Sequence, residues 1–543
     1  MRAAVYNRYW ATGGGAEKYG GAIAQILAAD GPLDLLSHDP IDVDWLAERL
    51  RLDLSGVNVR LLDDATGQVR SASADYDLFV NVSYMSTDRS AAPGSLYVVH
   101  FPTPLDGHLS RVQRHLADRL ANRRSGLGRV AMEWGEGFYG REGGARGVAW
   151  TNGRGRLSFT TEPGQPVSVE FVFGNLRPPE LGPTTVRIEV DGREAAEVEL
   201  VPPTSRVVAH LGKHVRVPLA SPEPNRPVEV ALISDTFVPA QVQHTDDRRR
   251  LGVPLVGLNI GTGPVARLSR WFPLLRSSRA SIGWIDSYSL LVANSAFTRH
   301  WIDRYWAHDS EVLYPPVTMH AVGDKENVIL NVGRFFPADK GHSKKQLELV
   351  HAFRRLHDAG ARDWTLHLVG GCAEAGEAYL DQVRSAAAGY PVELHVNASG
   401  EELESLYARA SIYWHASGYG EDTHRHPDRL EHFGISTVEA MSAGAVPVVI
   451  GLAGQRETVR HGIDGFHFRT LDGLCALTRS LTRDPVLLRR LSAAAARRAR
   501  LYSLDAFADQ LHTLVARALA PGSPPSPPAD LDRADPAEVR PGR

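Results

Sequence analysis

Two carboxylates flank a short segment whose other residues suit a phosphate site. The segment reads Glu431-His-Phe-Gly-Ile-Ser-Thr-Val-Glu439. Ser436 and Glu439 have the spacing of a capping box, which predicts a helix from Ser436 to about Ala443. The first turn of a helix presents unpaired N–H groups and the positive end of the helix dipole, so it can hold a diphosphate. The residues expected to line this site are Gly434, Ile435, Ser436 and Thr437.

The two carboxylates are expected to do different work. Gly434 should interrupt any helix that contains both of them, which leaves Glu431 on a loop where it can face a sugar. Glu439 falls in the first turn of the predicted helix, where it can reach a ribose hydroxyl. In isolation, Glu439 could be only a capping partner and Glu431 only a surface charge.

A basic pair follows a predicted strand at 327–332. Arg334 and Lys340 could stabilise the charge that collects on a departing diphosphate, and they could replace a metal ion in that task. The alternative is two solvated basic residues. His424, His426 and His432 lack a supporting ligand set, so no metal site is predicted there.

Glycines and a histidine end other predicted strands. Gly13, Gly14 and Gly15 follow the strand at 3–6, while Gly370 and Gly371 end the strand at 364–369. Glycine lets the backbone approach a ligand closely, although Gly370 and Gly371 could also form an ordinary tight turn. The first loop is not a complete G-x-G-x-x-G, which argues against an oxidoreductase. His100 ends the strand at 96–100, where a structural histidine is the alternative.

Composition narrows the class of protein. The chain has 543 residues, 43% hydrophobic and 23% charged, with a net charge of -3, so nothing favours nucleic acid as a partner. Cys372 and Cys475 are the only cysteines, which predicts a reducing, cytoplasmic compartment. No signal peptide and no membrane-spanning helix are expected, so any membrane contact would be peripheral. The basic and aromatic segment 267–276 could dock on an anionic bilayer or form a solvated face.

The elements that position these residues form three patterns. Short strands alternate with helices before about residue 145 and again after 288, which is typical of parallel sheets covered by helices. Residues 151–238 have short β-rich runs separated by turn signals, which predicts an inserted antiparallel β-sandwich. Its aromatic side chains could stack on sugars or could form its core. The predicted parts are 1–120 and 255–317 for the first α/β domain, 121–254 for the insert, 318–487 for the second α/β domain, 488–519 for C-terminal helices that cross back, and 520–543 for a disordered tail.

The segment from Phe433 to Val449 closely resembles the donor-site signature of the GT-B glycosyltransferases of family 4. Asn331 to Gly341 is similar to that family's segment for the donor diphosphate, and residues 288–295 and 314–316 resemble its mannosyltransferase branches. Glu457 and Gly465 match the closing segment, where both are interpreted as structural. The resemblance covers roughly 1–105 and 255–515; the insert and Thr318-Met319 depart from it.

The resemblance implies a retaining hexosyltransferase with two Rossmann-like domains that face across a cleft. The donor would be a nucleotide sugar, GDP-mannose or a UDP-sugar, and the acceptor a glycan, a lipid-linked glycan or a small molecule. Arg334 and Lys340 would hold the diphosphate, Glu439 the ribose and Glu431 the sugar, with His100 and Gly13–Gly15 completing the site. No cofactor and no metal would be needed. A GT-B phosphorylase, an epimerase and a non-catalytic glycan-binding protein are the alternatives.

Overall fold

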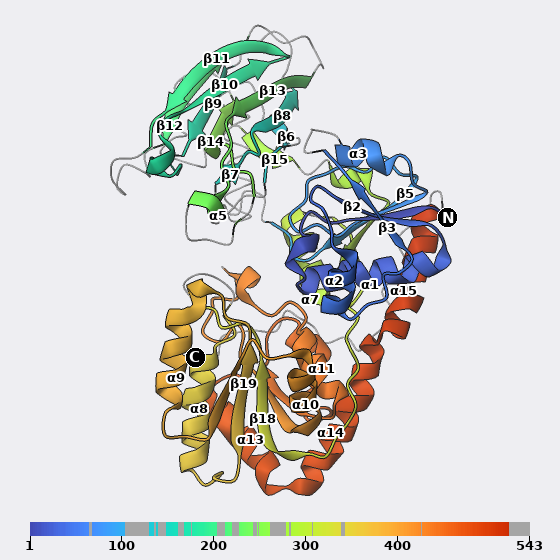
Figure 1. Ribbon diagram of the computed structural model, residues 1–543, viewed down its shortest axis with the longest axis vertical. Helices are drawn as coiled ribbons and strands as arrows, with labels where there is room; N and C mark the ends of the chain where they lie inside the picture. Colours follow the sequence, from blue (N-terminus) through green and yellow to red (C-terminus); the bar gives the residue numbers. More distant parts are fainter. Residues whose placement is uncertain are drawn as a thin grey trace. The chain divides into compact units, whose positions relative to one another are not determined.

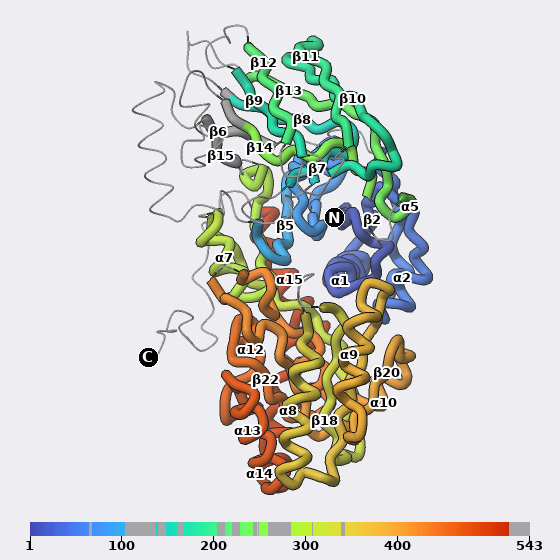
Figure 2. Tube along the Cα trace, turned by 90° about the vertical axis from the view of Figure 1, so that its left-hand side faces the viewer, coloured from blue at the N-terminus to red at the C-terminus, as the bar shows by residue number. Residues whose placement is uncertain are grey.

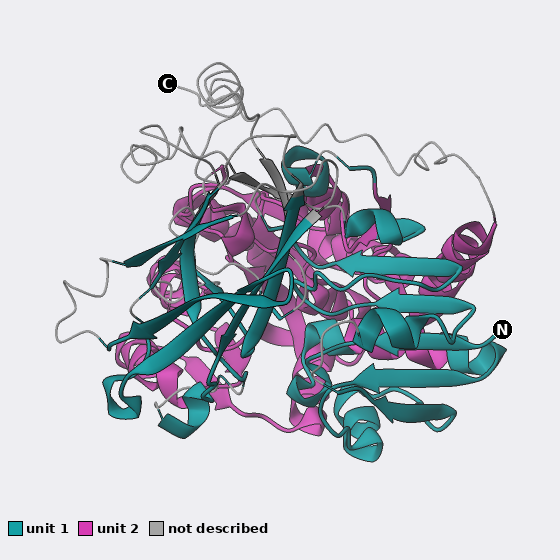
Figure 3. Cartoon of the chain, turned by 90° about the horizontal axis from the view of Figure 1, so that it is seen from above, with its two compact units in different colours: residues 1–17, 27–291, 301–309 teal, residues 18–26, 292–300, 310–543 magenta. Residues whose placement is uncertain are grey.

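The computed structural model describes residues 1–63, 68–103, 130–134, 137–139, 148–160, 168–174, 176–202, 212–219, 227–242, 247, 249–260, 278–281, 284–306, 308–337, 343–424 and 426–520. Lys340, the segment 267–276 and the tail after 520 lie outside the described residues. Two compact units are distinguished, residues 1–17, 27–291 and 301–309 in the first and residues 18–26, 292–300 and 310–543 in the second (Figure 3). The predicted domain boundaries stay predictions.

The N-terminal part of the chain forms a parallel sheet in the order β17-β16-β5-β4-β1-β2-β3. Its inner strands β1, β4 and β5 are buried along their whole length, as the continuous apolar runs predict for a sheet covered on both faces. Helices α1 (Gly15–Asp30), α2 (Val43–Leu50), α3 (Gln68–Ser73) and α7 (Ala296–Trp306) belong to this region. The strands are β1 (Ala3–Tyr6), β2 (Leu33–Ser37), β3 (Val57–Leu61), β4 (Leu78–Asn81), β5 (Gly94–Val99), β16 (Leu290–Ala293) and β17 (Glu311–Val312).

The middle of the chain forms two further sheets, of order β11-β10-β13-β8-β6-β15 and β12-β9-β14-β7 (Figure 2). All pairings but that of β15 with β6 are antiparallel. Strands of both sheets share one hydrophobic cluster, which includes Phe159, Phe171 and Ile188. The expected short strands are therefore confirmed, while the inserted sandwich domain stays a prediction. The strands are β6 (Val130–Trp134), β7 (Ala149–Trp150), β8 (Arg154–Thr160), β9 (Ser168–Phe173), β10 (Thr184–Val190), β11 (Arg193–Leu200), β12 (Lys213–Pro218), β13 (Pro227–Ser234), β14 (Pro254–Ile260) and β15 (Ser278–Ser281).

Most aromatic side chains that the structure describes in this middle region are buried, and Phe138 is half-buried against the same core. Tyr139, Trp150 and Phe237 are each 8% exposed and pack with Leu251 in one cluster. The hypothesis that exposed rings stack on sugars is wrong for these three, because all three are buried, and the guanidinium groups of Arg249 and Arg177 lie over the rings of Tyr139 and Phe237.

The C-terminal part forms a second parallel sheet, of order β20-β19-β18-β21-β22-β23. Helices α8 and α9 lie on one face of this sheet and α10 lies on the other (Figure 1). Side chains alternate between the two faces, so that Ile329 packs with α8 and α9, whereas Val328 and Leu330 pack with α10. This confirms the expected doubly wound arrangement. The strands are β18 (Glu326–Val332), β19 (Thr365–Gly370), β20 (Val392–Val396), β21 (Ala410–His415), β22 (Val446–Ile450) and β23 (Phe466–Phe468). The helices are α8 (Gln346–Asp358), α9 (Glu377–Ala387), α10 (Gly400–Arg409), α11 (Ile435–Ser442), α12 (Gln455–Thr458), α13 (Leu471–Arg483), α14 (Pro485–Ala499) and α15 (Leu504–Leu519).

None of the helices in the described part of the chain combines the length and the apolar character that crossing a membrane requires.

Candidate functional site

The order of the C-terminal sheet creates a switch point between β18 and β21. From β18 the chain winds outward through β19 to β20, and it then returns to β21 and winds the other way through β22 to β23. Ligands of doubly wound sheets bind beyond the carboxyl ends of the strands at such a point. Arg334 follows β18, and His415 is the last residue of β21, so both lie at this edge.

Glu431 meets two basic side chains here. Lys344 Nζ lies 2.6 Å from Glu431 Oε2, and His415 Nε2 lies 3.0 Å from the same oxygen. Because a carboxylate only accepts, the Nε2–H of His415 donates. Burial lowers the pKa of His415, and the contact with Glu431 opposes that shift. Glu431 is thus held in place by one lysine and one buried imidazole that come from different segments of the chain.

The backbone before α8 separates two adjacent lysines. Lys345 has φ +60°, in the left-handed region, and its Nζ lies 2.7 Å from Glu421 Oε1. Burial raises the pKa of Glu421, but Lys345 and Arg429 outweigh it and hold that pKa below its ordinary value. A left-handed non-glycine residue costs roughly 1 kcal/mol. The strain accompanies a turn that sends Lys344 to Glu431 and Lys345 to Glu421.

Helix α11 begins one residue earlier than the capping pattern predicted. Its N-cap is Gly434, and neither Ser436 nor any other side chain caps it. The Ser436 hydroxyl instead accepts a hydrogen bond from Tyr413 Oη at 2.8 Å. The predicted capping box is therefore wrong, and Glu439 lies in the second turn rather than the first. Tyr413 competes for the serine oxygen, so the local sequence pattern does not decide where the helix starts.

Gly434, the N-cap of α11, has a backbone conformation that favours glycine. Its φ of +97° lies in the left-handed region, and a Cβ placed there would approach Gln455 Nε2 to 2.4 Å. Gln455 Nε2 also donates to Thr437 Oγ1 at 3.0 Å, which ties the start of α11 to α12. This hydrogen bond fixes the position of the first turn of α11; the prediction that its N–H groups hold an anion stays a prediction.

Glu439 has a different environment from Glu431. Tyr407 Oη donates to Glu439 Oε2 at 2.9 Å, and Lys18 Nζ lies 3.3 Å from Oε1 within the second compact unit. Burial is the main cause of the raised pKa of Tyr413, and the charges of both Glu431 and Glu439 add to it. Glu431 therefore meets Lys344 and His415, whereas Glu439 meets Tyr407 and Lys18, so the two carboxylates have distinct surroundings.

Arg334 and the second glycine pair lie at the ends of β18 and β19. Arg334 is exposed, and its carbonyl accepts from Gln346 Nε2 at 3.0 Å. A Cβ on Gly370 would lie 2.0 Å from the carbonyl oxygen of Gly333, so glycine is required for this close approach. Asn397 supports the neighbouring Gly371 turn, because its Oδ1 accepts from Cys372 N at 3.2 Å.

The remaining predicted residues belong to the first compact unit. Gly13 has φ +55°, and Gly14 is the N-cap of α1, where its N–H donates to Glu17 Oε2 at 2.9 Å. Gly15 is the first residue of α1. His100 follows β5, and its Nε2 lies 2.9 Å from the carbonyl oxygen of Val82. Burial lowers the pKa of His100. Their part in donor binding stays a prediction.

Several residues around the carboxylates had no sequence prediction. Lys344 and His415 meet Glu431, and Tyr407 meets Glu439. The one available signal was position: His415 ends a predicted strand beside the switch point, as Arg334 does. Lys344 carried no signal, because adjacent lysines before a helix are ordinary surface residues.

Comparison with known families identifies this part of the chain. Residues 319–498 match the family described as Glycosyl transferases group 1. The chain carries a glycosyl transferases group 1 domain. The expectation of a glycosyltransferase is therefore confirmed for this domain, which contains Arg334, Glu431 and Glu439.

The chain is also similar in sequence to two curated proteins that have the same name, GDP-Man:Man(3)GlcNAc(2)-PP-Dol alpha-1,2-mannosyltransferase. The chain is 30% identical to the Dictyostelium discoideum protein over 209 residues, which cover 34% of this chain and 39% of that protein. It is 28% identical to the Xenopus laevis protein over 184 residues, 30% of this chain and 34% of the relative. The match thus spans well under half of each relative.

Among solved structures, the Anabaena protein HepE in complex with UDP and glucose is similar, with a TM-score of 0.48 and 13% identity over 95% of this chain and 99% of that chain. Sucrose-phosphate synthase from Thermosynechococcus elongatus has the same TM-score and identity over 95% of this chain and 98% of that chain.

Proposed function

We propose that this protein is a retaining GT-B glycosyltransferase of family 4 that transfers mannose from GDP-mannose to a glycan carried on a lipid diphosphate. The observation that carries the proposal is the contact of Glu431 with Lys344 and His415 beside the start of α11. The family match covers this site, and the names of the Dictyostelium and Xenopus relatives supply the donor and the class of acceptor.

The proposed roles follow from the charges. A diphosphate is an anion, so it would lie at the N-terminus of α11 with Lys344 and Arg334 as its cations, and no metal ion is needed in this scheme. Glu431 would accept hydrogen bonds from the sugar hydroxyls. His415 would position Glu431, because it donates to Oε2 from the end of a buried strand. Glu439, held by Tyr407, would accept from the ribose.

The transfer itself would take place on one face of the sugar. The bond between the anomeric carbon and the β-phosphate oxygen breaks, and the acceptor oxygen forms a new bond to that carbon on the same side. The acceptor proton passes to a phosphate oxygen of the departing nucleoside diphosphate. Such a step needs no protein nucleophile, and it depends on cations that stabilise the charge of the leaving group.

Donor binding tests the proposal first. Thermal unfolding of the full-length protein is measured with GDP-mannose, UDP-glucose and ADP-glucose. A donor at 100 times its Kd should stabilise the folded protein by about 2.7 kcal/mol, and we expect this effect with GDP-mannose. Stabilisation by UDP-glucose instead would refute the assigned base, and no stabilisation by any of the three would refute a donor site.

Product analysis tests the reaction. A synthetic isoprenoid-diphosphate glycan is the acceptor, and the anomeric configuration of the product is measured by NMR. We expect transfer with retained configuration and independent of inorganic phosphate. A product that forms only with inorganic phosphate would indicate a phosphorylase, and an altered sugar nucleotide without transfer would indicate an epimerase.

A further inference from the structure

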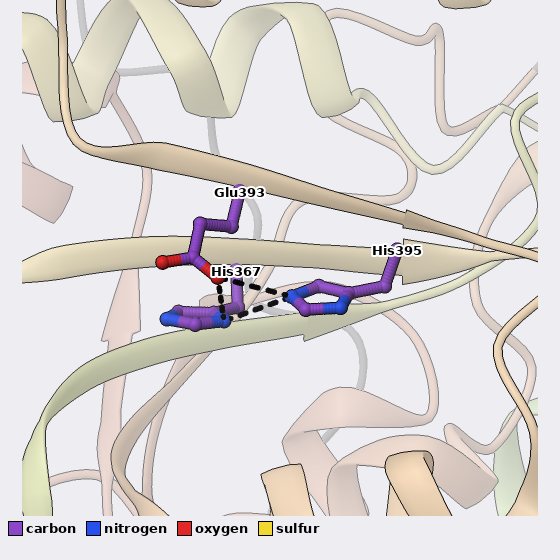
Figure 4. Close-up of side chains that lie close together, drawn as sticks. All are labelled: His367, Glu393 and His395. Atoms are coloured by element: carbon purple, nitrogen blue, oxygen red, sulfur yellow. Dashed lines mark hydrogen bonds and ion pairs between the residues drawn. The ribbon is translucent and has the colours of Figure 1, made fainter.

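Two histidines and a glutamate converge on one face at the edge of the C-terminal sheet. His367 lies on β19, and Glu393 and His395 lie on the edge strand β20 (Figure 4). The parallel register pairs His367 with Glu393, and His395 follows Glu393 by two positions. Because side chains alternate between the faces of a strand, all three project from the same face. None of them belongs to the donor site proposed above.

The distances among their ligand atoms fit a single ion. His367 Nδ1 lies 3.0 Å from His395 Nε2, and Glu393 Oε2 lies 3.6 Å from the first nitrogen and 3.7 Å from the second. Tetrahedral zinc with bonds of about 2.1 Å keeps its ligand atoms about 3.4 Å apart. The three distances between ligand atoms in this structure lie on either side of about 3.4 Å. An ion could therefore bind all three atoms with little movement of the side chains.

Outer hydrogen bonds orient both imidazoles. His395 Nδ1 lies 2.6 Å from Glu402 Oε1, and a carboxylate can only accept, so Nδ1 carries the proton and Nε2 presents a lone pair. Glu402 is itself fixed, because its N–H donates to the N-cap Ser399 of α10 at 3.1 Å. A carboxylate behind a ligating histidine is the usual support of a metal site.

His367 is suited to the same ion. Its Nε2 lies 3.1 Å from Thr365 Oγ1, so donation to that hydroxyl leaves a lone pair on Nδ1 that faces His395. The neutral imidazole is the form that ligates a metal. Three acceptor atoms would then point at one place, and a cation there would satisfy all of them.

We propose that His367, Glu393 and His395 bind one divalent transition-metal ion of the zinc type, with water as the fourth ligand. Two imidazoles and one carboxylate suit zinc or cobalt, whereas magnesium and calcium prefer oxygen ligands alone. The ion would join the edge strand β20 to β19, and through Glu402 it would join both strands to α10. The site is structural, and it does not depend on the proposed glycosyltransferase activity.

Metal titration of the full-length protein tests the site. The protein is dialysed against a chelator and titrated with Co²⁺, whose visible absorption reports four-coordinate geometry, and then with Zn²⁺ in competition. We expect one equivalent of Co²⁺ with the intense bands of a tetrahedral site and displacement by Zn²⁺. Zn²⁺ should also raise the Tm. If Thr365 instead donates to His367 and the two histidines merely share a hydrogen bond, no intense bands appear and the proposal is overturned.

Variants assign the ligands. Glu393→Gln changes a side chain that is 58% exposed, so the fold should persist, and we expect metal affinity to fall at least 10-fold and the Tm shift with Zn²⁺ to vanish. Glu402→Gln should weaken binding about 10- to 100-fold, as second-layer partners do. The double variant His424→Ala and His426→Ala removes two exposed histidines elsewhere and should bind normally. Unchanged affinity in Glu393→Gln, or loss in the double variant, would refute the assignment.

Discussion

The carboxylate of Glu431 and the imidazole of His415 lie 3.0 Å apart, although 16 positions separate them in the sequence. His415 is 1% exposed at the side chain and ends a buried strand, so it is a fixed point against which a loop carboxylate can be held. His415 Nδ1 has no hydrogen-bond partner among the described residues. The relationship suggests that Glu431 is positioned before any substrate arrives, which is what stabilisation of a transition state requires.

Replacing Glu431 should abolish most of the proposed transfer. Glu431→Gln keeps the shape but removes the charge that Lys344 meets, and we expect kcat to fall about 100-fold or more, as for the loss of one preorganised polar contact. Steady-state kinetics with GDP-mannose provide the measurement. Glu401→Gln, on an exposed position of α10, is the matched control and should behave as the wild type. Full activity of Glu431→Gln would disprove its role.

His415 should act through Glu431 rather than on the substrate. A hydrogen bond to a charged group contributes about 1.5–3 kcal/mol, so His415→Ala should reduce kcat roughly 10- to 100-fold. His415→Gln retains an N–H donor and should recover part of the loss. The separate effects on kcat and KM are measured for both variants. Equal loss in the two variants would indicate a packing effect instead of positioning.

Replacing Lys344 should affect donor binding, whereas replacing the adjacent Lys345 should affect the stability of the fold. Lys344→Met removes the partner of Glu431 and should reduce donor affinity, measured by the thermal shift with GDP-mannose. Lys345 is 7% exposed at the side chain, and Lys345→Met leaves Arg429, at 3.5 Å, as the remaining cation beside Glu421 in the described part of the chain. Breaking a buried ion pair costs about 3–5 kcal/mol, so this variant should unfold at lower denaturant concentration. The reverse pattern would contradict the assignment.

Gly434 should resist substitution more strongly than a glycine in open space. Gly434 and Gly389 both have positive φ, but a Cβ on Gly389 meets nothing within 4 Å, whereas one on Gly434 meets Gln455. Gly389→Ala should cost about 1 kcal/mol of backbone strain. Gly434→Ala should cost about 2–4 kcal/mol and also weaken donor binding. Denaturant unfolding of both variants checks the difference; equal costs would show that Gln455 moves aside.

Glu457 should make the stability depend on pH. Burial raises the pKa of Glu457 from 4.5 to about 7, although its carboxylate accepts from Ala296 N and Phe297 N at the start of α7. Between these pH values the folded state holds a proton that the unfolded state has lost, so stability falls as pH rises from 4.5 to 7. The loss is about 3 kcal/mol, at 1.36 kcal/mol per pKa unit.

The Glu457→Gln variant isolates this effect. The variant lacks the titrating carboxyl at position 457. The free energy of unfolding of the wild type minus that of the variant should therefore change between pH 4.5 and 7 and stay constant above about pH 8. Urea unfolding at several pH values measures it. A constant difference across the whole range would show that Glu457 is ionised throughout.

The sequence by itself determined the elements and their class. Apolar runs and helical periodicity predicted β18, β19, β21 and β22 with the helices between them, because these signals arise from neighbours in the chain and from burial on both faces of a parallel sheet. Gly434 and Gly370 were also predictable as special positions, since glycine adopts a left-handed backbone and allows a close backbone approach at lower cost than other residues. The resemblance of the segment from Phe433 to Val449, rather than the spacing of Glu431 and Glu439 alone, pointed to the proposed site.

Only the tertiary structure decided what those residues meet. Lys344 and His415 reach Glu431 from other segments because the sheet order places the ends of β18 and β21 side by side. The Ser436 capping pattern failed for the same reason, as Tyr413 takes its hydroxyl from a neighbouring strand. His367 and His395 came together through the register of two strands. Local patterns fix the backbone of each element, whereas the partner of a polar side chain depends on distant segments that packing brings within hydrogen-bond distance.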